Sequence, residues 1–487
     1  SFFTPKIWAD KSKEYLAKVF GEAWQDEYFV WDCAAGTGNL LAGLKNKYNV
    51  WASDIDEGNI ETIMSLIDID ENLDLLPSHI FRFDFLNDSF DKLPEGLRDI
   101  INDPEKRKKL IVYINPPYAE VSSVGVKGKA GVNQSKIHDK YISCLGTAGR
   151  ELFTQFLARI YFEISDCKIG EFSKMKMLNG SAFETFRNYF KAKLEKCFVV
   201  PANTFDNVSG QFPIGFKIWD TSIKKCFRNI IADVFDAANN PHGNKAFFNY
   251  GKKNVINKWI SLYKNKSGNV IGFLAGTNGN DFQQNKIVYI LNNREQMANP
   301  RGIEITESNI IECAIYQTVR HVFESSWIND RDQFLYPNDG YKTDTEFQHS
   351  CLVYTLFNNN IQSLHGVNNW IPFTEKEVDA KEKFCSNFMS DYLKGKTFSP
   401  EARAVLDAGR ELWKYYHAKI KGNKTASVNA SFYDIREFFQ GRGGRGAMKT
   451  RSEDEAYNAL IKTLRDRLRL LTEKIQPRVY EYGFLRE

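Results

Sequence analysis

The chain has 487 residues, 43% of them hydrophobic and 14% aromatic, with a formal net charge of +4. Such a chain can bury a large core, which excludes a disordered protein, and no apolar run approaches the ~20 residues that a membrane span needs. The eight cysteines and seven histidines are scattered, without C-x-x-C or H-E-x-x-H spacing, which argues against a disulfide framework and a protein-bound metal. We therefore expect a cytoplasmic protein with reduced thiols, no metal and no membrane partner.

The first 220 residues alternate short apolar strands with amphipathic helices. Helices are predicted over residues 7–20, 150–165 and 181–196. Seven strands are predicted, over residues 28–31, 49–53, 80–83, 110–114, 168–173, 198–201 and 214–219. This alternation is typical of a Rossmann-like, doubly wound α/β fold, with a mostly parallel seven-stranded sheet covered on both faces.

A glycine-rich turn follows the first strand, with Asp32, Ala34, Gly36, Gly38 and Asn39 in the run DCAAGTGN. Such a turn lets the backbone approach a ligand closely. A dinucleotide site is the obvious alternative, but it requires a third glycine, and Leu41 occupies that position. Asp32 would also repel a pyrophosphate, whereas it would attract a ligand that carries an ammonium group.

Acidic residues also end the next two strands. Asp54-Ile55-Asp56 follows the second strand, where a carboxylate binds a ribose diol in this type of sheet. Asp56 is independently expected as an acid at the start of the next helix. Asp54 is favoured for the ribose because it follows the strand directly. Asp84-Phe85 ends the third strand, where an acceptor and a ring could bind the amino group and cover the face of an adenine.

The fourth strand stops at Asn115-Pro116-Pro117-Tyr118. Two prolines end strand pairing, because neither has an N–H, and they hold the backbone extended. Asn115 then offers a side-chain carbonyl, Pro116 a backbone carbonyl and Tyr118 a flat ring. Two acceptors beside a stacking surface suit a planar ring that bears an exocyclic amino group.

The pattern changes after about residue 220. Mixed segments with Asn- and Gly-rich turns precede a helical tail that begins near Ser399-Pro400 and includes a last helix over 453–475. Long segments without predicted structure are uncommon unless they serve a site, and residues 119–149 form one such segment. We predict three regions, namely 1–225, 226–398 and 399–487.

Together these residues resemble the class I S-adenosylmethionine-dependent amino-methyltransferases of DNA, in the adenine-N6, gamma-type branch found in restriction–modification systems. Phe3-Thr4-Pro5 is similar to the family's N-terminal motif, and Asn115 to Tyr118 to its catalytic motif. The resemblance implies these cofactor-binding residues: Phe3, Thr4, Pro5, Asp32, Ala34, Gly36, Gly38, Asn39, Asp54, Ile55, Asp84, Phe85 and Asn115. It also implies catalysis by Asn115, Pro116, Pro117 and Tyr118, with Tyr118 and either Phe205 or Phe212 stacking on the target base.

The implied activity is site-specific methyl transfer from S-adenosylmethionine to N6 of an adenine flipped out of double-stranded DNA. Residues 1–225 would be the catalytic domain, 226–398 the target-recognition region and 399–487 a helical C-terminal region. A restriction endonuclease domain or subunit is allowed as a further partner, and the first residues, Ser-Phe-Phe, suggest a longer protein. The alternatives are a glutamine N5 or RNA base methyltransferase with the same motif, a cytosine-N4 target, and a non-catalytic DNA-specificity subunit.

Overall fold

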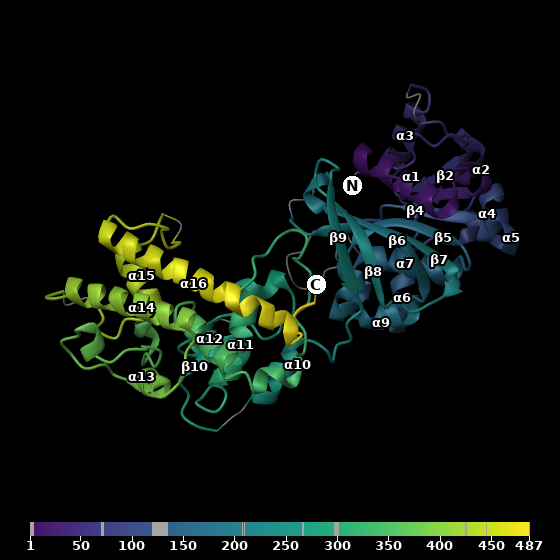
Figure 1. The fold of residues 1–487 in the computed structure, drawn as a ribbon. Helices are drawn as coiled ribbons and strands as arrows, with labels where there is room; N and C mark the ends of the chain where they lie inside the picture. Colours follow the sequence, from purple (N-terminus) through teal and green to yellow (C-terminus); the bar gives the residue numbers. More distant parts are fainter. Residues whose placement is uncertain are drawn as a thin grey trace. The chain divides into compact units, whose positions relative to one another are not determined.

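The computed structural model describes residues 4–69, 73–118, 135–206, 208, 210–264, 267–296, 301–423, 426–444 and 446–486. The chain divides into two compact units, Ser1–Lys252 with Ser326–Arg331, and Lys253–Ser325 with Asp332–Glu487 (Figure 1). Each unit has its own hydrophobic core. The two units are described separately.

A sheet of nine strands, counted over the described residues, forms the centre of the first unit, in the order β3-β2-β1-β4-β5-β7-β6-β8-β9 (Figure 1). The first five strands are parallel, and β7 runs antiparallel to β5 and β6. The strands are β1 Phe29–Asp32, β2 Val50–Asp54, β3 Ile80–Arg82, β4 Leu110–Ile114, β5 Lys168–Lys174, β6 Ala192–Pro201, β7 Pro213–Lys224, β8 Asn229–Phe235 and β9 Pro241–Phe248. The predicted doubly wound, mostly parallel α/β class is confirmed, with two more strands than the seven predicted.

Helices bury both faces of this sheet, because successive strand residues point to opposite sides. In β4, Ile111 and Tyr113 join the core formed with α1 and α3, while Leu110, Val112 and Ile114 join the core formed with α4, α6, α7 and α9. The helices of this unit are α1 Lys6–Phe20, α2 Trp24–Glu27, α3 Glu57–Leu66, α4 Glu95–Asn102, α5 Pro104–Lys108, α6 Lys136–Leu145, α7 Leu152–Glu163, α8 Lys176–Asn179 and α9 Glu184–Tyr189.

Two local predictions in this unit are wrong. The helix predicted over 181–196 ends as α9 at Tyr189, and Ala192–Pro201 forms β6 instead. Lys, Leu and Glu in this stretch favour a helix, but pairing along the whole of β7 overrides that weak propensity. The segment predicted to lack structure over 119–149 contains α6, whose first turn is capped by the Ser135 hydroxyl.

The predicted region boundaries differ from the two units. The boundary at 225 precedes β8 and β9, yet β8 pairs with β6 and extends the sheet to Phe248. The helical tail predicted from residue 399 is not a separate body, because its residues Leu412, Trp413 and Leu464 share one core with Ile310 and Leu352. Short strands that complete a sheet and helices that complete a core carry no boundary signal in sequence.

The second unit is mainly helical around one core. Its small sheet has the order β11-β10-β12. The 20-residue helix α14 and the 27-residue helix α16 lie side by side, green and yellow in Figure 1. The elements are α10 Ile256–Ile260, β10 Gly272–Ala275, β11 Ile290–Leu291, β12 Gly302–Ile305, α11 Ile310–His321, α12 Thr345–Leu356, α13 Phe388–Leu393, α14 Pro400–Lys419, α15 Phe432–Gln440 and α16 Glu455–Glu481.

Pro400 lies in the first turn of α14, as predicted, and the Ser399 hydroxyl caps this helix by accepting from the Ala402 N–H. Within the described residues, no helix is both long and apolar enough to cross a membrane. Over the same part of the chain, no cluster of three or more His, Cys, Asp or Glu side chains has the arrangement of a metal site.

Candidate active site

The strand order of the first unit reverses between β1 and β4. From β1 the chain goes to β2 and β3 on one side, and then to β4 and β5 on the other. In open α/β sheets, ligands bind at the carboxyl ends of the strands at this switch point. β1 ends at Asp32, β2 ends at Asp54, and β4 is followed directly by Asn115. The residues predicted from sequence are therefore brought to one edge of the sheet.

The glycine-rich turn is fixed to the end of β2. Gly36 and Gly38 have φ values of 55° and 86°, which side chains rarely adopt. The Gly36 N–H donates to Asp54 Oδ2 at 2.9 Å, and the Ala35 N–H donates to the Ser53 carbonyl at 3.0 Å. The turn is thus held open against the β2 end, with its backbone presented at the edge of the sheet.

Asp54 is 8% exposed and already serves the fold. Its Oδ1 accepts from the Asp56 N–H at 2.9 Å and from Asn59 Nδ2 at 3.1 Å. Oδ2 accepts from the Gly36 N–H and can accept a second hydrogen bond, so a ribose contact remains chemically available at this oxygen. Asp56 caps α3 through the Gly58 N–H, which is the helix-start role anticipated for it. Ile55, between the two acids, is 55% exposed.

Asp32 is a buried acid without a cationic partner among the described residues. It is 1% exposed, and its Oδ1 accepts from the Ala34 N–H at 3.0 Å. Burial raises the pKa of Asp32 to about 8, the Ala34 hydrogen bond lowers it, and the nearby Asp54 carboxylate raises it further. Among the described residues Asp32 forms no ion pair. A ligand ammonium group beside it would stabilise the carboxylate form.

Both ends of the Asn115 amide are engaged by the protein. Asn115 Nδ2 donates to Thr4 Oγ1 at 2.9 Å, and Oδ1 accepts from the Tyr118 hydroxyl at 2.5 Å. Thr4 is buried and Tyr118 is 6% exposed. Burial raises the pKa of the Tyr118 phenol well above its usual value, so the hydroxyl keeps its proton and acts as the donor. The Tyr118 hydroxyl occupies one of the two acceptor positions of Oδ1, so it would compete with a substrate amino group for this oxygen.

The N-terminal motif is placed beside this amide in part. Thr4 and Pro5 are described, whereas Phe3 lies outside the described residues. Pro5 precedes the first turn of α1. Asn39 of the glycine-rich turn donates from Nδ2 to the Thr4 carbonyl at 3.5 Å. Thr4 therefore contacts both the turn after β1 and the motif after β4.

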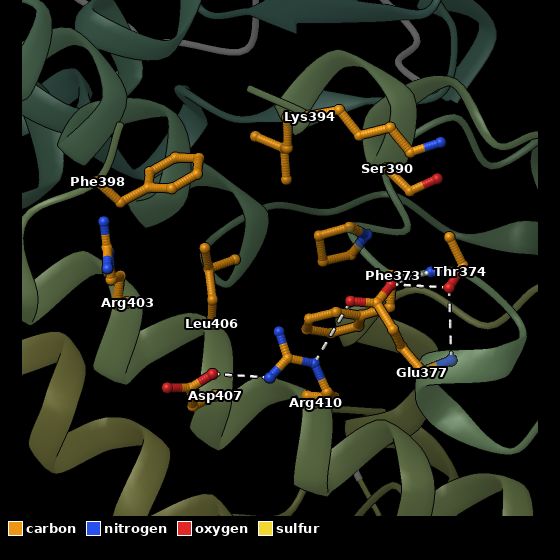
Figure 2. A pocket seen from close by; sticks show the side chains of 12 residues that line it. Phe373, Thr374, Glu377, Ser390, Lys394, Phe398, Arg403, Leu406, Asp407 and Arg410 are labelled. Carbon is orange, nitrogen blue, oxygen red and sulfur yellow. Dashed lines mark hydrogen bonds and ion pairs between the residues drawn. The ribbon is translucent and has the colours of Figure 1, made fainter. Parts of the chain in front are cut away.

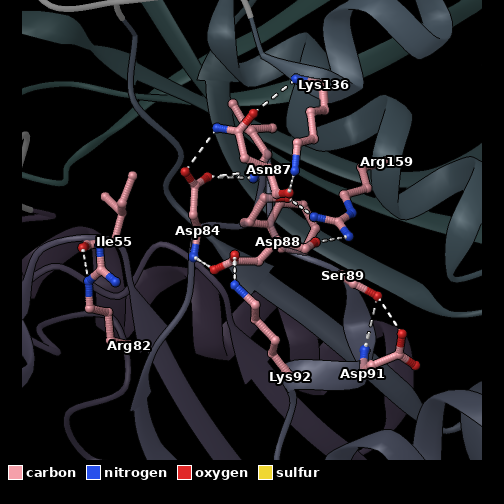
Figure 3. A network of polar contacts seen from close by, with 12 residues as sticks. Ile55, Arg82, Asp84, Asn87, Asp88, Ser89, Asp91, Lys92, Lys136 and Arg159 are labelled. Atoms are coloured by element: carbon pink, nitrogen blue, oxygen red, sulfur yellow. Dashed lines mark hydrogen bonds and ion pairs between the residues drawn. The ribbon is translucent and has the colours of Figure 1, made fainter.

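The Asp84 carboxylate is held in a local network (Figure 3). Oδ1 accepts from the N–H groups of Leu86 and Asn87, at 3.0 and 3.1 Å, and Oδ2 accepts from Asn87 Nδ2 at 2.9 Å. At the start of α6, the Lys136 N–H donates to the side-chain carbonyl of Asn87, and Lys136 Nζ donates to its main-chain carbonyl. These contacts fix the direction of the carboxylate at the edge of the sheet.

Phe85 lies differently from the contact expected for it. The ring is 2% exposed and stacks on Phe156 with centroids 5.0 Å apart. Arg159 lies above Phe85 and donates to backbone carbonyls of the same turn. Phe85 therefore has no exposed face with which to cover an adenine. Its core role could not be separated from a ligand role in sequence, because both need an aromatic ring after the strand.

The two candidate stacking rings differ in exposure. Phe205 is 2% exposed and packs edge-on against Tyr118, at 6.4 Å between centroids, and against Phe172, at 5.6 Å. Phe212 is half-buried, and the Arg331 guanidinium lies 5.9 Å from its ring centroid. Phe205 thus supports Tyr118 from within the core, while Phe212 is the more accessible ring.

Sequence reasoning missed Lys174, the last residue of β5. Its Nζ donates to the Tyr118 carbonyl at 3.1 Å and pairs with Glu151 Oε2 at 3.0 Å. Glu151 is 4% exposed and also pairs with Lys176. Lys174 therefore fixes the main chain at the end of the Asn115–Tyr118 motif. Because it lies 56 residues from Tyr118, only the parallel pairing of β4 and β5 brings it there.

No protein-family model matches the chain, and no curated protein matches it. Among solved structures, it is similar to a DrdV–DNA complex (13% identity, TM-score 0.37, 49% of this chain and 28% of that one). It is similar to the type ISP restriction–modification enzyme LlaBIII bound to DNA (15%, 0.38, 66% and 26%) and to the type I restriction enzyme EcoKI M protein (12%, 0.32, 48% and 48%). These similarities are weak, and the chain spans between about a quarter and a half of those proteins.

Proposed function

We propose that this chain is a DNA methyltransferase that transfers a methyl group from S-adenosylmethionine to N6 of adenine, as part of a restriction–modification or related defence system. The observation that carries the proposal is the placement of the Asn115 amide and the Pro116 carbonyl at the switch point, beside buried Asp32 and the glycine-rich turn. The first unit would be catalytic, and Lys253–Ser325 with Asp332–Glu487 would contact the DNA target.

The residues of the first unit fit the proposed cofactor. The Asp32 carboxylate suits the ammonium of the cofactor's methionine end. Gly36 and Gly38 have no side chain, so the cofactor could approach the backbone of the turn closely, and the positive φ of both residues would strain any other residue there. Asp54 would accept from the ribose hydroxyls, exposed Ile55 would pack on the adenine, and Asp84 would accept from its amino group. When bound, the cofactor supplies the electrophilic methyl group.

The residues around Asn115 would prepare the nucleophile. An adenine N6 lone pair is delocalised into the ring and is a weak nucleophile. Hydrogen bonds from N6–H to Asn115 Oδ1 and to the Pro116 carbonyl would localise that lone pair towards the methyl group, so the protein contributes positioning and charge stabilisation. Thr4 holds the amide in the orientation that presents Oδ1, because it accepts from Nδ2.

Base entry would displace the Tyr118 hydroxyl from Asn115. The Tyr118 ring would then stack on one face of the extruded base, and Phe212, the more accessible ring of its loop, on the other. Phe205 would support Tyr118 from the core. Pro117 would keep the backbone extended between the two acceptors and the ring.

The experiment offers methyl-labelled S-adenosylmethionine with duplex DNA, RNA and a protein extract in parallel, and measures which polymer gains the label. We expect label on DNA. Label on RNA or on glutamine would favour the alternative substrates of the same motif. Cofactor binding without any transfer would indicate a non-catalytic specificity subunit. The absence of both cofactor binding and methyl transfer would contradict the proposal.

A further inference from the structure

A cavity in the second unit is lined by positive side chains. Its volume is about 460 Å³, within the usual range for small-ligand sites. It lies between α10 and the edge formed by β10 and β12, which supply Ile260, Phe273 and Ile303 as its apolar lining. These three side chains are at most 4% exposed, so the apolar wall is part of the packed fold.

Three exposed cations line this cavity. Lys264, Arg294 and Arg301 line it together with one carboxylate, Glu304. Within the described residues, none of the three cations forms an ion pair. Three like charges around one cavity repel each other, and an anion bound between them would relieve this repulsion. The excess of two positive charges over the lining therefore favours an anionic ligand.

A second cavity of similar size shows the contrast (Figure 2). It has a volume of about 520 Å³ and is lined by Lys394, Arg403 and Arg410. Arg410 pairs with Asp407 at 2.7 Å and with Glu377 at 3.7 Å, and Lys394 pairs with Asp391 at 2.5 Å. Two of its three cations are thus neutralised by the protein itself. In the cavity beside β12, the β12 cavity, all three cations lack such an ion pair with the described residues.

Neutral donors complete the lining of the β12 cavity. Asn257, Thr277 and Asn278 supply amide and hydroxyl groups, whereas the Ser261 hydroxyl in the same lining already donates to the Lys258 carbonyl at 2.8 Å. Asn257 Oδ1 accepts from the Tyr316 hydroxyl at 2.7 Å, which leaves its Nδ2 as the group available to a ligand. Guanidinium, ammonium, amide and hydroxyl donors around one space match the several acceptor oxygens of a phosphate better than the two of a carboxylate.

We infer that this cavity binds a phosphate ester and that its natural source is the DNA backbone, so that Lys264, Arg294 and Arg301 contact the backbone of the substrate and not its bases. This deepens the proposed function and rests on it only for the identity of the nucleic acid. Phosphate contacts fix the register of a protein on its duplex without reading sequence. The cavity is therefore a positioning site and contributes no catalytic group.

The test measures duplex DNA binding by the full chain as a function of salt concentration. Arg294→Ala and Arg301→Ala should each weaken binding and reduce the slope of log affinity against log salt by about 1. Glu304→Gln should have the opposite effect and tighten binding, because it removes the one carboxylate. The matched control is Arg467→Ala, an exposed arginine on α16 that forms no ion pair with the described residues. Equal losses in all three arginine variants, or weaker binding by Glu304→Gln, would overturn the inference.

A second probe separates the two sources of phosphate. Thymidine 3′,5′-bisphosphate is titrated into the wild-type chain and into Arg301→Ala. Loss of nucleotide binding in the variant with an unchanged DNA salt slope would assign the cavity to a free nucleotide and overturn the DNA assignment. Methyl transfer is assayed on the same samples. If the arginine variants have reduced salt slopes for DNA binding but the wild type transfers no methyl group, only the proposed function is contradicted. If the wild type transfers normally and the variants have unchanged salt slopes, only this inference is contradicted.

Discussion

The candidate active site and the β12 cavity differ in how their polar groups are held by the protein. At the sheet edge, Asn115, Asp54 and Asp84 are all held by hydrogen bonds within the first unit. In the β12 cavity, Arg294 and Arg301 have no ion pair within the described residues. Chemistry at one atom requires groups fixed in advance, since small displacements are costly. Attraction of a charged polymer requires charge, which acts over a longer range and is weakened by salt. The first site should therefore respond to single-atom changes, and the second to ionic strength.

The largest expected effect is that of Asn115→Ala. Methyl transfer should fall by at least about 10²–10³-fold, the cost of losing one preorganised hydrogen-bonding group in other enzymes. Cofactor affinity should stay within a few-fold of wild type, because the amide is assigned to the substrate. Single-turnover transfer and a cofactor titration measure the two quantities. Loss of cofactor binding in this variant would contradict the assigned role.

The next effect is that of Asp32→Asn on cofactor binding. Removing a charge-assisted contact of about 1.5–3 kcal/mol should weaken binding about 10- to 100-fold. In the wild type, affinity should rise with pH towards the Asp32 pKa of about 8, because the carboxylate form is the one that binds the ammonium. Calorimetric titration at several pH values measures both. A pH-independent affinity in the wild type would separate Asp32 from the ligand ammonium.

Asp32 also makes a stability prediction. Its pKa is raised in the folded chain from 3.8 to about 8, so the folded state binds the extra proton between these values. The contribution of Asp32 to the free energy of unfolding is therefore complete below about pH 4 and is lost as pH rises through about 8. Asp32→Asn should remove this part of the pH dependence. Chemical denaturation of both proteins from about pH 5 to about pH 8.5 measures how the free energy of unfolding changes with pH. Parallel slopes for the wild type and Asp32→Asn would contradict the buried-acid account.

Asp54→Ala should have an effect of intermediate size. It removes the acceptor proposed for the ribose and releases the Gly36 N–H, so cofactor affinity should fall about tenfold. The transfer rate at saturating cofactor should change less than the affinity. Asp56→Ala is the matched control, because Asp56 only caps α3. A slower rate at saturation with normal affinity would remove Asp54 from the ribose contact.

The smallest expected effect is that of Tyr118→Phe. The substitution frees Asn115 Oδ1 and keeps a ring for stacking, so KM for DNA should fall about two- to tenfold with the transfer rate little changed. Tyr118→Ala, which also removes the ring, should instead raise KM. An increase of KM in both variants would show that the hydroxyl contributes to substrate binding and does not compete with it.

The parts of this fold that could be predicted from sequence are those written in local patterns. Local patterns mark the strands that end at Asp32 and Asp54, the strand that is followed by Asn115, and the turn with Gly36, and the structure has all of them at these positions. Lys174 could not be predicted as a neighbour of Tyr118, since strand pairing alone brings it there. The burial of Phe85 and the first part of β6, over residues 192–196, were missed because tertiary packing overrode the local signal, whereas the last part of β6 was predicted as a strand over 198–201. The β12 cavity joins Lys264, which precedes β10, with Arg294 and Arg301 from the connection between β11 and β12, and no motif marks it.

The most direct test of the central claim compares the wild type with Asn115→Ala on one duplex DNA of mixed sequence. Both proteins receive methyl-labelled S-adenosylmethionine, and the DNA is digested to nucleosides. The account predicts N6-methyladenine as the labelled product of the wild type and none above background from the variant, although the variant still binds the cofactor. Labelled N4-methylcytosine would correct the target base. Unlabelled DNA with the wild type, or equal N6-methyladenine from both proteins, would contradict the role given to the Asn115 site.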